Sequence, residues 1–272
     1  MKKKCCISTL FALLVILFSM SAYAVTITPF DGAAAMASSI MGKDVIISNA
    51  SYTGATGASG YFSFAEAENG IGIDNGIILT TGSASYASGG GYSLYNGSAP
   101  DEDLNALIGA NTTHDATVLE FDFVSTSDAF AFDYVFAAFE AGPTVYNDVF
   151  GLFVDRVVGG VYADNKTNYA LIDAGPVAIN NADLSWNNPG SPSVDIAYVY
   201  YTDMLTATIT GLSSEETYHL KIAIADVYDN QWDSGVFIKG SVPLSSPVPE
   251  PMTLILLGSG LLGLAGIRKK MK

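Results

Sequence analysis

The chain has almost no cysteine and very few basic residues away from its ends. Its two cysteines, Cys5 and Cys6, both lie within the first six residues. The rest of the chain can therefore form no disulfide and offers no thiol nucleophile. Its stability must come from a packed hydrophobic core, which a body of this length is large enough to bury.

Basic side chains are outnumbered by acidic ones, with 12 Lys and Arg against 27 Asp and Glu and a formal net charge of −15. Between residues 25 and 249 the basic residues are Lys43, Arg156, Lys166, Lys221 and Lys239. A surface this acidic repels nucleic acid and anionic lipid, so we expect no nucleic-acid partner. It suits solubility outside a cell and attracts divalent cations, although excess carboxylates can also serve solvation alone.

Catalytic motifs are missing as well. The chain has no G-x-S-x-G, no H-x-x-x-H pair and no phosphate-binding loop, and its histidines are His114 and His219. His114 lies in a polar turn. His219 and Lys221 alternate with apolar residues in an expected strand, which predicts that both face solvent. We therefore expect no enzyme, with a glycosidase that uses two of the many carboxylates as the alternative.

Residues 1–24 have the three parts of a secretory signal peptide. Basic residues follow Met1, residues 7–18 are mostly apolar, and Ala22 and Ala24 form an A-x-A cleavage pattern. The sequence predicts cleavage between Ala24 and Val25 after passage through the export translocase. The apolar run is short for a stable membrane span.

From residue 25 to residue 243 the pattern predicts an all-β fold, a single β-sandwich or jelly-roll-like domain with one or two short helices. One helix is expected over 32–41, with Asp31 as its N-cap and Gly42 as its end, and another from Pro100 to Ile108. The expected strands are 45–47, 76–82, 118–124, 129–136, 149–154, 161–162, 169–172, 177–179, 194–201, 206–210, 218–225 and 235–238.

Two acidic turns have no basic residue within them. Asp226, Asp229 and Asp233 fall in one turn, and Glu140 and Asp148 bracket the other. Calcium takes six to eight oxygen ligands from flexible loops of this kind, so the five residues are a hypothetical calcium site. The alternative is that these side chains cap turns by accepting hydrogen bonds from their own backbone.

The C-terminus has three consecutive parts. Residues 244–251 form a proline-rich linker that ends in the motif Val248, Pro249, Glu250 and Pro251, and residues 252–267 carry no charge. Residues 268–272 are basic, with Arg268, Lys269 and Lys270 in sequence. This order predicts one membrane-spanning helix over 252–267 with a cytoplasmic basic tail.

This tail resembles the PEP-CTERM protein-sorting signal of Gram-negative bacteria in all three parts. The resemblance implies recognition by an exosortase-type enzyme in the inner membrane and cleavage near the Pro-Glu-Pro triplet. It also implies a transient inner-membrane anchor, then release to the outer surface or the extracellular matrix, in cells that make exopolysaccharide.

The body resembles the choice-of-anchor L domain through residues 133–137, 147–151, 217–226 and 233–237, which read DYVFA, NDVFG, TYHLKIAIAD and DSGVF. The usual Ser-Glu-Glu-Tyr of the family is replaced by residues 138–141, which keep one glutamate, Glu140. The resemblance implies a secreted surface domain without an established activity.

Composition and resemblance together predict a non-enzymatic protein of the cell surface or biofilm matrix that binds glycan or protein with possible help from calcium. A secreted carbohydrate-active enzyme and a passive structural protein are the alternatives.

Overall fold

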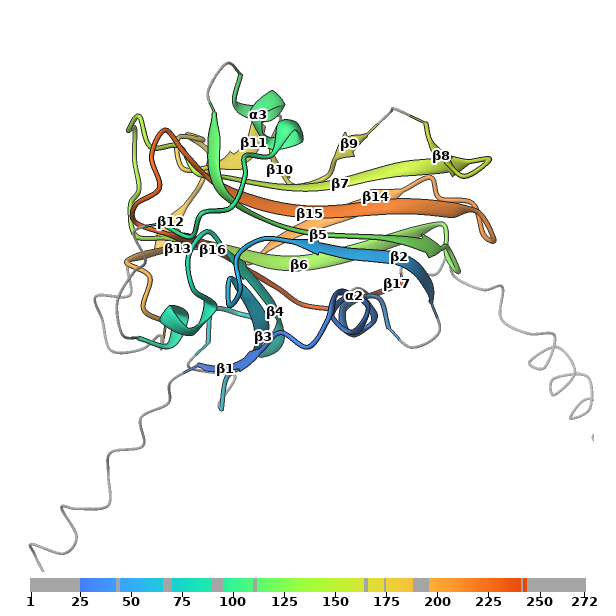
Figure 1. The fold of residues 1–272 in the computed structure, drawn as a ribbon, viewed down its shortest axis with the longest axis horizontal. Helices are drawn as coiled ribbons and strands as arrows, with labels where there is room; N and C mark the ends of the chain where they lie inside the picture. The colour runs from blue at the N-terminus through green and yellow to red at the C-terminus, as the bar shows by residue number, and fades with distance from the viewer. Residues whose placement is uncertain are drawn as a thin grey trace, which may run out of the picture.

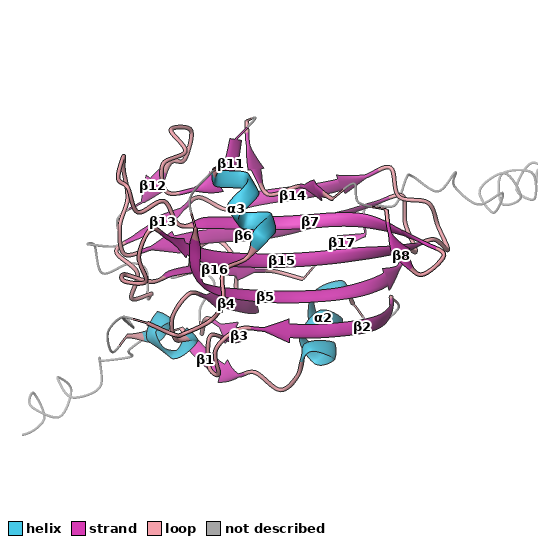
Figure 2. Ribbon diagram, turned by 45° about the horizontal axis from the view of Figure 1, so that its top comes forward, coloured by secondary structure: helices cyan, strands magenta, loops and turns pink. Residues whose placement is uncertain are grey.

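The computed structural model describes residues 25–42, 45–65, 70–89, 95–109, 112–163, 166–173, 175–187, 196–240 and 242–243. These residues fold into two antiparallel sheets that face each other (Figures 1 and 2). The predicted signal peptide and the whole tail from residue 244 lie outside them. Within these ranges, no helix has the length and apolar character needed to cross a membrane.

The first sheet has nine strands in the described part of the chain. Its order is β1 (Thr26–Pro29), β3 (Ser59–Ser63), β4 (Asn75–Thr80), β16 (Ser234–Ile238), β6 (Ala129–Ala138), β13 (Tyr200–Thr202) and β12 (Trp186–Asn187), while β14 (Leu205–Thr210) and β17 (Val242–Pro243) also pair with β6.

The second sheet has eight strands over the same described ranges. Its order is β10 (Leu171–Ile172), β11 (Gly175–Ala178), β7 (Val149–Val158), β15 (Thr217–Val227), β5 (Thr113–Val124) and β2 (Ile46–Thr53), while β8 (Val161–Tyr162) and β9 (Thr167–Asn168) pair with β7.

The main core lies between the sheets and is built by strict alternation along the long strands. Phe121 and Phe123 of β5 face Phe130 and Phe132 of β6, and all four are fully buried. The rings of Phe123 and Phe130 meet edge to face with centroids 5.8 Å apart. Burying a side chain of this size stabilises the fold by roughly 1.5–3 kcal/mol. The predicted all-β sandwich is therefore confirmed.

In the described part of the chain, two short α-helices and one 3-10 helix, η2 (Ala84–Ser88), accompany the sheets. Helix α3 (Glu102–Ile108) begins two residues after the expected start at Pro100 and ends as predicted at Ile108, and the carboxylate of its N-cap Asp101 accepts the Leu104 N–H at 3.0 Å. Helix α2 (Ala33–Met41) ends at Gly42 as predicted, but Gly32 is its N-cap. The expected Asp31 cap is wrong, because this carboxylate accepts the Tyr61 hydroxyl at 2.5 Å.

The prediction that His219 and Lys221 face solvent is also wrong, since they are only 6% and 7% exposed. They do lie on the face of β15 that points away from the core. That face is covered, because the ring of Tyr162 in β8 packs 4.2 Å from the His219 ring. The residues that begin α3 reach Lys221, whose ammonium donates to Asp101 at 2.6 Å.

Most strand predictions match the structure within a few residues, and the exceptions are local. The strand expected over 194–201 appears only as β13, which begins at Tyr200, and residues 196–199 are not strand. Strands β1, β3, β9, β12 and β17 were not predicted. All five are short, and β1 and β17 pair with strands far away in the sequence.

Candidate functional site

Two loops cross between the sheets at the same end of the sandwich, on the left in Figure 1. The β6–β7 loop, residues 139–148, runs from the first sheet to the second, and the β15–β16 loop, residues 228–233, returns from the second to the first. These are the two acidic turns of the sequence. The fold therefore brings together two segments that are about 80 positions apart along the chain.

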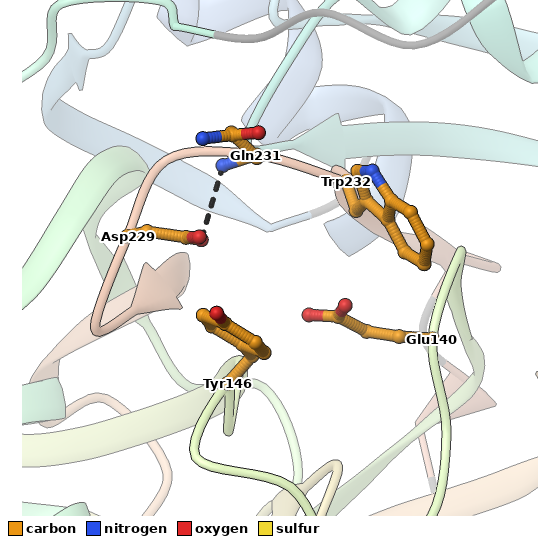
Figure 3. Close-up of a pocket in the computed structure, with 5 residues that line it drawn as sticks. All are labelled: Glu140, Tyr146, Asp229, Gln231 and Trp232. Carbon is orange, nitrogen blue, oxygen red and sulfur yellow. Dashed lines mark hydrogen bonds between the residues drawn. The ribbon is translucent and has the colours of Figure 1, made fainter.

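Between the loops lies a pocket of about 210 Å³ lined by Glu140, Tyr146, Asp229, Gln231 and Trp232. Figure 3 shows the Glu140 carboxylate pointing into the space between Tyr146 and Trp232. Asp229 lines the other side, where its carboxylate accepts the Gln231 N–H at 3.2 Å. The pocket thus combines aromatic surfaces with carboxylate and amide groups.

The aromatic residues of the β15–β16 loop are exposed and held in a costly backbone conformation. Tyr228 and Trp232 are 63% and 47% exposed, and their φ angles are +81° and +66°. A bulky residue in this left-handed region costs on the order of 1–3 kcal/mol. The Tyr228 ring also packs edge to face against Tyr146 across the loops, with centroids 5.7 Å apart. Strain of this kind is concentrated at functional sites.

Glu140 is the acid that points into the pocket. Burial, followed by the negative charge of Asp229, raises the pKa of Glu140 to about 7. Its Oε1 atom is buried and has no hydrogen-bond partner among the described residues. Near neutral pH this carboxyl group is therefore divided between its protonated and ionised forms.

Behind the pocket lie two fully buried carboxylates, one at the base of each loop. Asp148 accepts the Val227 N–H at 3.1 Å and the Ser234 hydroxyl at 2.6 Å. Asp226 is 0% exposed, and neither of its oxygens has a hydrogen-bond partner in the described part of the chain. Burial and the neighbouring negative charges raise the pKa of Asp148 to about 8 and that of Asp226 well above its usual value.

The five residues of the hypothetical calcium site thus gather at one end of the molecule, in two layers. Glu140 and Asp229 line the pocket, and Asp148, Asp226 and Asp233 are buried behind it. Within the described ranges, no three His, Cys, Asp or Glu side chains are grouped so that they could hold a metal ion by themselves. Calcium binding therefore stays a prediction.

The alternative role for these acids, capping of turns, fits some of them. Asp148 and Asp229 accept backbone N–H groups, as that interpretation expects. Asp226 accepts none. Sequence reasoning missed Tyr146, Gln231 and Trp232, whose only signal was their position inside the two acidic turns.

The remaining predicted sites concern export. Ala24, the sorting motif Val248–Pro251, the expected membrane helix and the basic residues Arg268 to Lys270 lie outside the described residues. Val25, the expected first residue of the mature chain, is described and buried.

A family model for the choice-of-anchor L domain matches residues 28–242. The chain belongs to the choice-of-anchor L domain family. A second model, for the PEP-CTERM protein-sorting motif, matches residues 247–270 of this choice-of-anchor L protein. This motif marks export and sorting at a membrane, with processing by an exosortase-type enzyme. Both resemblances seen in the sequence are confirmed.

No curated protein is significantly similar to this choice-of-anchor L protein. Among solved structures, a carbohydrate-binding module specific for non-crystalline cellulose, CBM28, aligns at a TM-score of 0.36 and 15% identity. The alignment covers 72% of this chain and 88% of that one. At this TM-score and identity, neither the fold nor the ligand of that module can be assigned to this chain.

Proposed function

We propose that this choice-of-anchor L protein is a non-enzymatic protein of the cell surface or extracellular matrix whose body binds glycan in the pocket between the β6–β7 and β15–β16 loops. The observation that carries the proposal is the exposed aromatic side chains around a polar pocket, held out by a strained loop. Aromatic faces pack against the apolar faces of sugar rings, and carboxylate and amide groups bond to hydroxyls.

The size of the pocket limits the ligands that it can hold. Its volume of about 210 Å³ is below the roughly 300–1,000 Å³ typical of sites that enclose drug-sized molecules. We infer that it takes one sugar residue, at the end or along the edge of a polysaccharide. The sorting motif supports this ligand class, because the PEP-CTERM resemblance implies a cell that makes exopolysaccharide.

A glycan array with the mature exported protein tests the proposal. Trp232→Ala is expected to weaken binding to the recognised glycan about tenfold, which corresponds to about 1.4 kcal/mol. Tyr162→Ala is the matched control, because Tyr162 is a partly exposed aromatic residue of β8 at the opposite end of the sandwich. The absence of any glycan binding, or equal binding by wild type and Trp232→Ala, would reject the proposal.

A glycosidase is the second candidate, and one observation favours it. Glu140 and Asp229 line the same pocket, and the raised pKa of Glu140 is the property that a general acid needs near neutral pH. Release of reducing ends from the glycan identified on the array separates the two functions. If wild type cleaves the glycan and Glu140→Gln binds it without cleavage, the protein is an enzyme. The binding proposal expects no cleavage by either.

A further inference from the structure

The described basic side chains of the body are all engaged away from the pocket. Arg156 pairs with Glu216, Lys166 and Lys221 with Asp103, Lys221 also with Asp101, and Lys239 with Asp74, while His219 contacts Asp122 and Glu120. No ion pair among the described residues reaches Asp148 or Asp226. His114 stands opposite Asp226 in the register of β5 and β15, and its charge acts on Asp115.

Asp226 is buried with no ion-pair partner among the described residues. It is completely buried, and both carboxylate oxygens lack a hydrogen-bond partner among the described residues. The Thr81 hydroxyl is close enough to lower the pKa of Asp226, but it donates to the Ser234 carbonyl oxygen at 3.5 Å and accepts the Ser234 N–H at 3.0 Å. Buried polar atoms are nearly always hydrogen-bonded, and an unpaired buried carboxylate is among the most costly exceptions. An oxygen pair left unused in this way points to a ligand.

Asp148 lies beside Asp226 and completes the anionic part of the cluster. After burial, the charge of Asp148 is the largest influence that raises the pKa of Asp226. The Asp148 oxygens each accept one hydrogen bond, which leaves lone pairs free, because a carboxylate offers about four acceptor positions. The hydroxyl oxygens of Ser234 and Thr81 adjoin the two acids. All of these donors are hard oxygen atoms.

We propose that Asp226 and Asp148 bind a calcium ion between the bases of the β6–β7 and β15–β16 loops, behind the pocket. Calcium accepts six to eight oxygens from carboxylates, neutral protein groups and water in irregular geometry. Neutral oxygens and water must complete the shell, since no three acidic or histidine side chains converge among the residues that the structure describes. Zinc favours nitrogen and sulfur ligands in tetrahedral sites, and magnesium demands near-ideal octahedra.

The site lies where two long strands pair, because Val149 of β7 stands opposite Ala225 of β15. Asp148 ends the β6–β7 loop, and Asp226 lies just before the β15–β16 loop, so one ion would fix both loops at their bases. These loops carry the pocket, and any effect of calcium on glycan affinity rests on the proposed function. The ion site itself does not rest on it.

The test is calcium titration calorimetry and thermal denaturation of the mature protein after treatment with chelator. Calcium at about 100 times its Kd is expected to raise the Tm by about 5–10 °C. Asp226→Asn is nearly isosteric and removes one anionic ligand, so it should abolish the rise and remain folded in chelator. Asp148→Asn should weaken calcium binding as well, and it serves as the second variant if Asp226→Asn does not fold.

Two controls separate a specific calcium site from non-specific attraction of calcium to an acidic surface. Glu215→Gln removes an exposed acid in the β14–β15 turn, at the other end of the sandwich, and should keep the full calcium response. Trp232→Ala should also keep it, so that failure of glycan binding leaves the ion result intact. Absence of heat and of a Tm shift with wild type would overturn the proposal. So would an equal response to magnesium, or an undiminished calcium response in Asp226→Asn.

Discussion

The outer face of the eight-stranded sheet and the loop end of the sandwich both bury carboxylates, but only the sheet face supplies cations for them. On the sheet face, Asp122 contacts His219 at 2.8 Å, and Asp101 contacts Lys221 at 2.6 Å. At the loop end, Asp148 and Asp226 have no basic partner among the described residues. Burial is thus common to both regions, and the presence of a counter-ion separates them.

The pKa values follow this difference. Burial alone would raise the pKa of Asp103, but Lys221 and Lys166 outweigh it and lower the pKa below its usual value. The pKa of Asp148 is raised to about 8, because burial acts there without an opposing cation. The sheet face therefore keeps its charges at neutral pH, while burial at the loop end favours the protonated forms of Asp148 and Asp226.

The largest effect should come from removing the cation of the sheet face. Lys221→Met leaves Asp101 and Asp103 partly buried without that cation, and breaking a buried pair in this way costs about 3–5 kcal/mol of unfolding free energy. Urea denaturation measures it. Lys239→Met is the control, since the 3.6 Å pair of Lys239 with Asp74 is exposed and should contribute below about 1 kcal/mol. Equal losses in the two variants would contradict the comparison.

The hydrogen bond that holds Asp148 should matter less. Ser234→Ala removes the 2.6 Å hydroxyl bond to Asp148 and should lower the unfolding free energy by about 1–2 kcal/mol, measured with urea in chelator. Ser88→Ala removes an exposed bond to the Ser85 carbonyl and should cost less. If Ser88→Ala proves the more harmful, the Asp148 contact is not important for stability.

The charge of His219 should make the Tm depend on pH. Burial alone would lower the pKa of His219, but Glu120 and Asp122 outweigh it and raise it. A base with a raised folded pKa stabilises the protein fully below its unfolded pKa of about 6.5 and loses that stabilisation as the pH rises through the folded value.

Thermal denaturation from about pH 6 to pH 9 should therefore show a falling Tm. The raised pKa of Asp148 acts in the same direction, so the difference between wild type and His219→Gln isolates the histidine. Asp155 of β7 and Tyr162 also flank His219 and stay unchanged in that variant. If wild type and His219→Gln show the same dependence of Tm on pH, protonation of His219 does not contribute to stability.

The smallest effect is expected from the exposed pair of Arg156 and Glu216. These side chains are 52% and 42% exposed, although their charged atoms approach to 2.9 Å. Arg156→Gln should change the unfolding free energy by less than about 0.5 kcal/mol, and added salt should reduce the difference further. A loss comparable to that of Lys221→Met would mean that distance, rather than burial, sets the strength of these pairs.

The sequence predicted the parts of the fold that depend on neighbouring residues. Alternation in β5 and β6 identified their core faces, and the acidic residues that follow Pro100 identified the start of α3, because they adjoin it in the chain. His219 was misplaced for the complementary reason. Alternation tells which residues share a face, but the cover on that face comes from β8 and from the start of α3, which lie elsewhere in the chain.

Prediction of the candidate site from the sequence met the same limit. The acidic turns were visible as two separate segments, and their meeting depends on two crossovers between sheets. Trp232 carried no periodic pattern, and its importance rests on exposure, pocket position and a φ of +66°, none of which the composition of a loop reveals.

The pairing of β17 determines where the end of the described chain lies relative to the pocket. Val242 and Pro243 pair with Ala131 and Phe130 near the start of β6, whereas Glu140 lies two residues after the end of that strand. Ten residues at about 3.3 Å each put roughly 30 Å between these points. The chain therefore leaves its folded body at the pole opposite to the pocket. If the body is attached through the residues after Pro243, the exposed rings of Tyr228 and Trp232 therefore face away from the point of attachment.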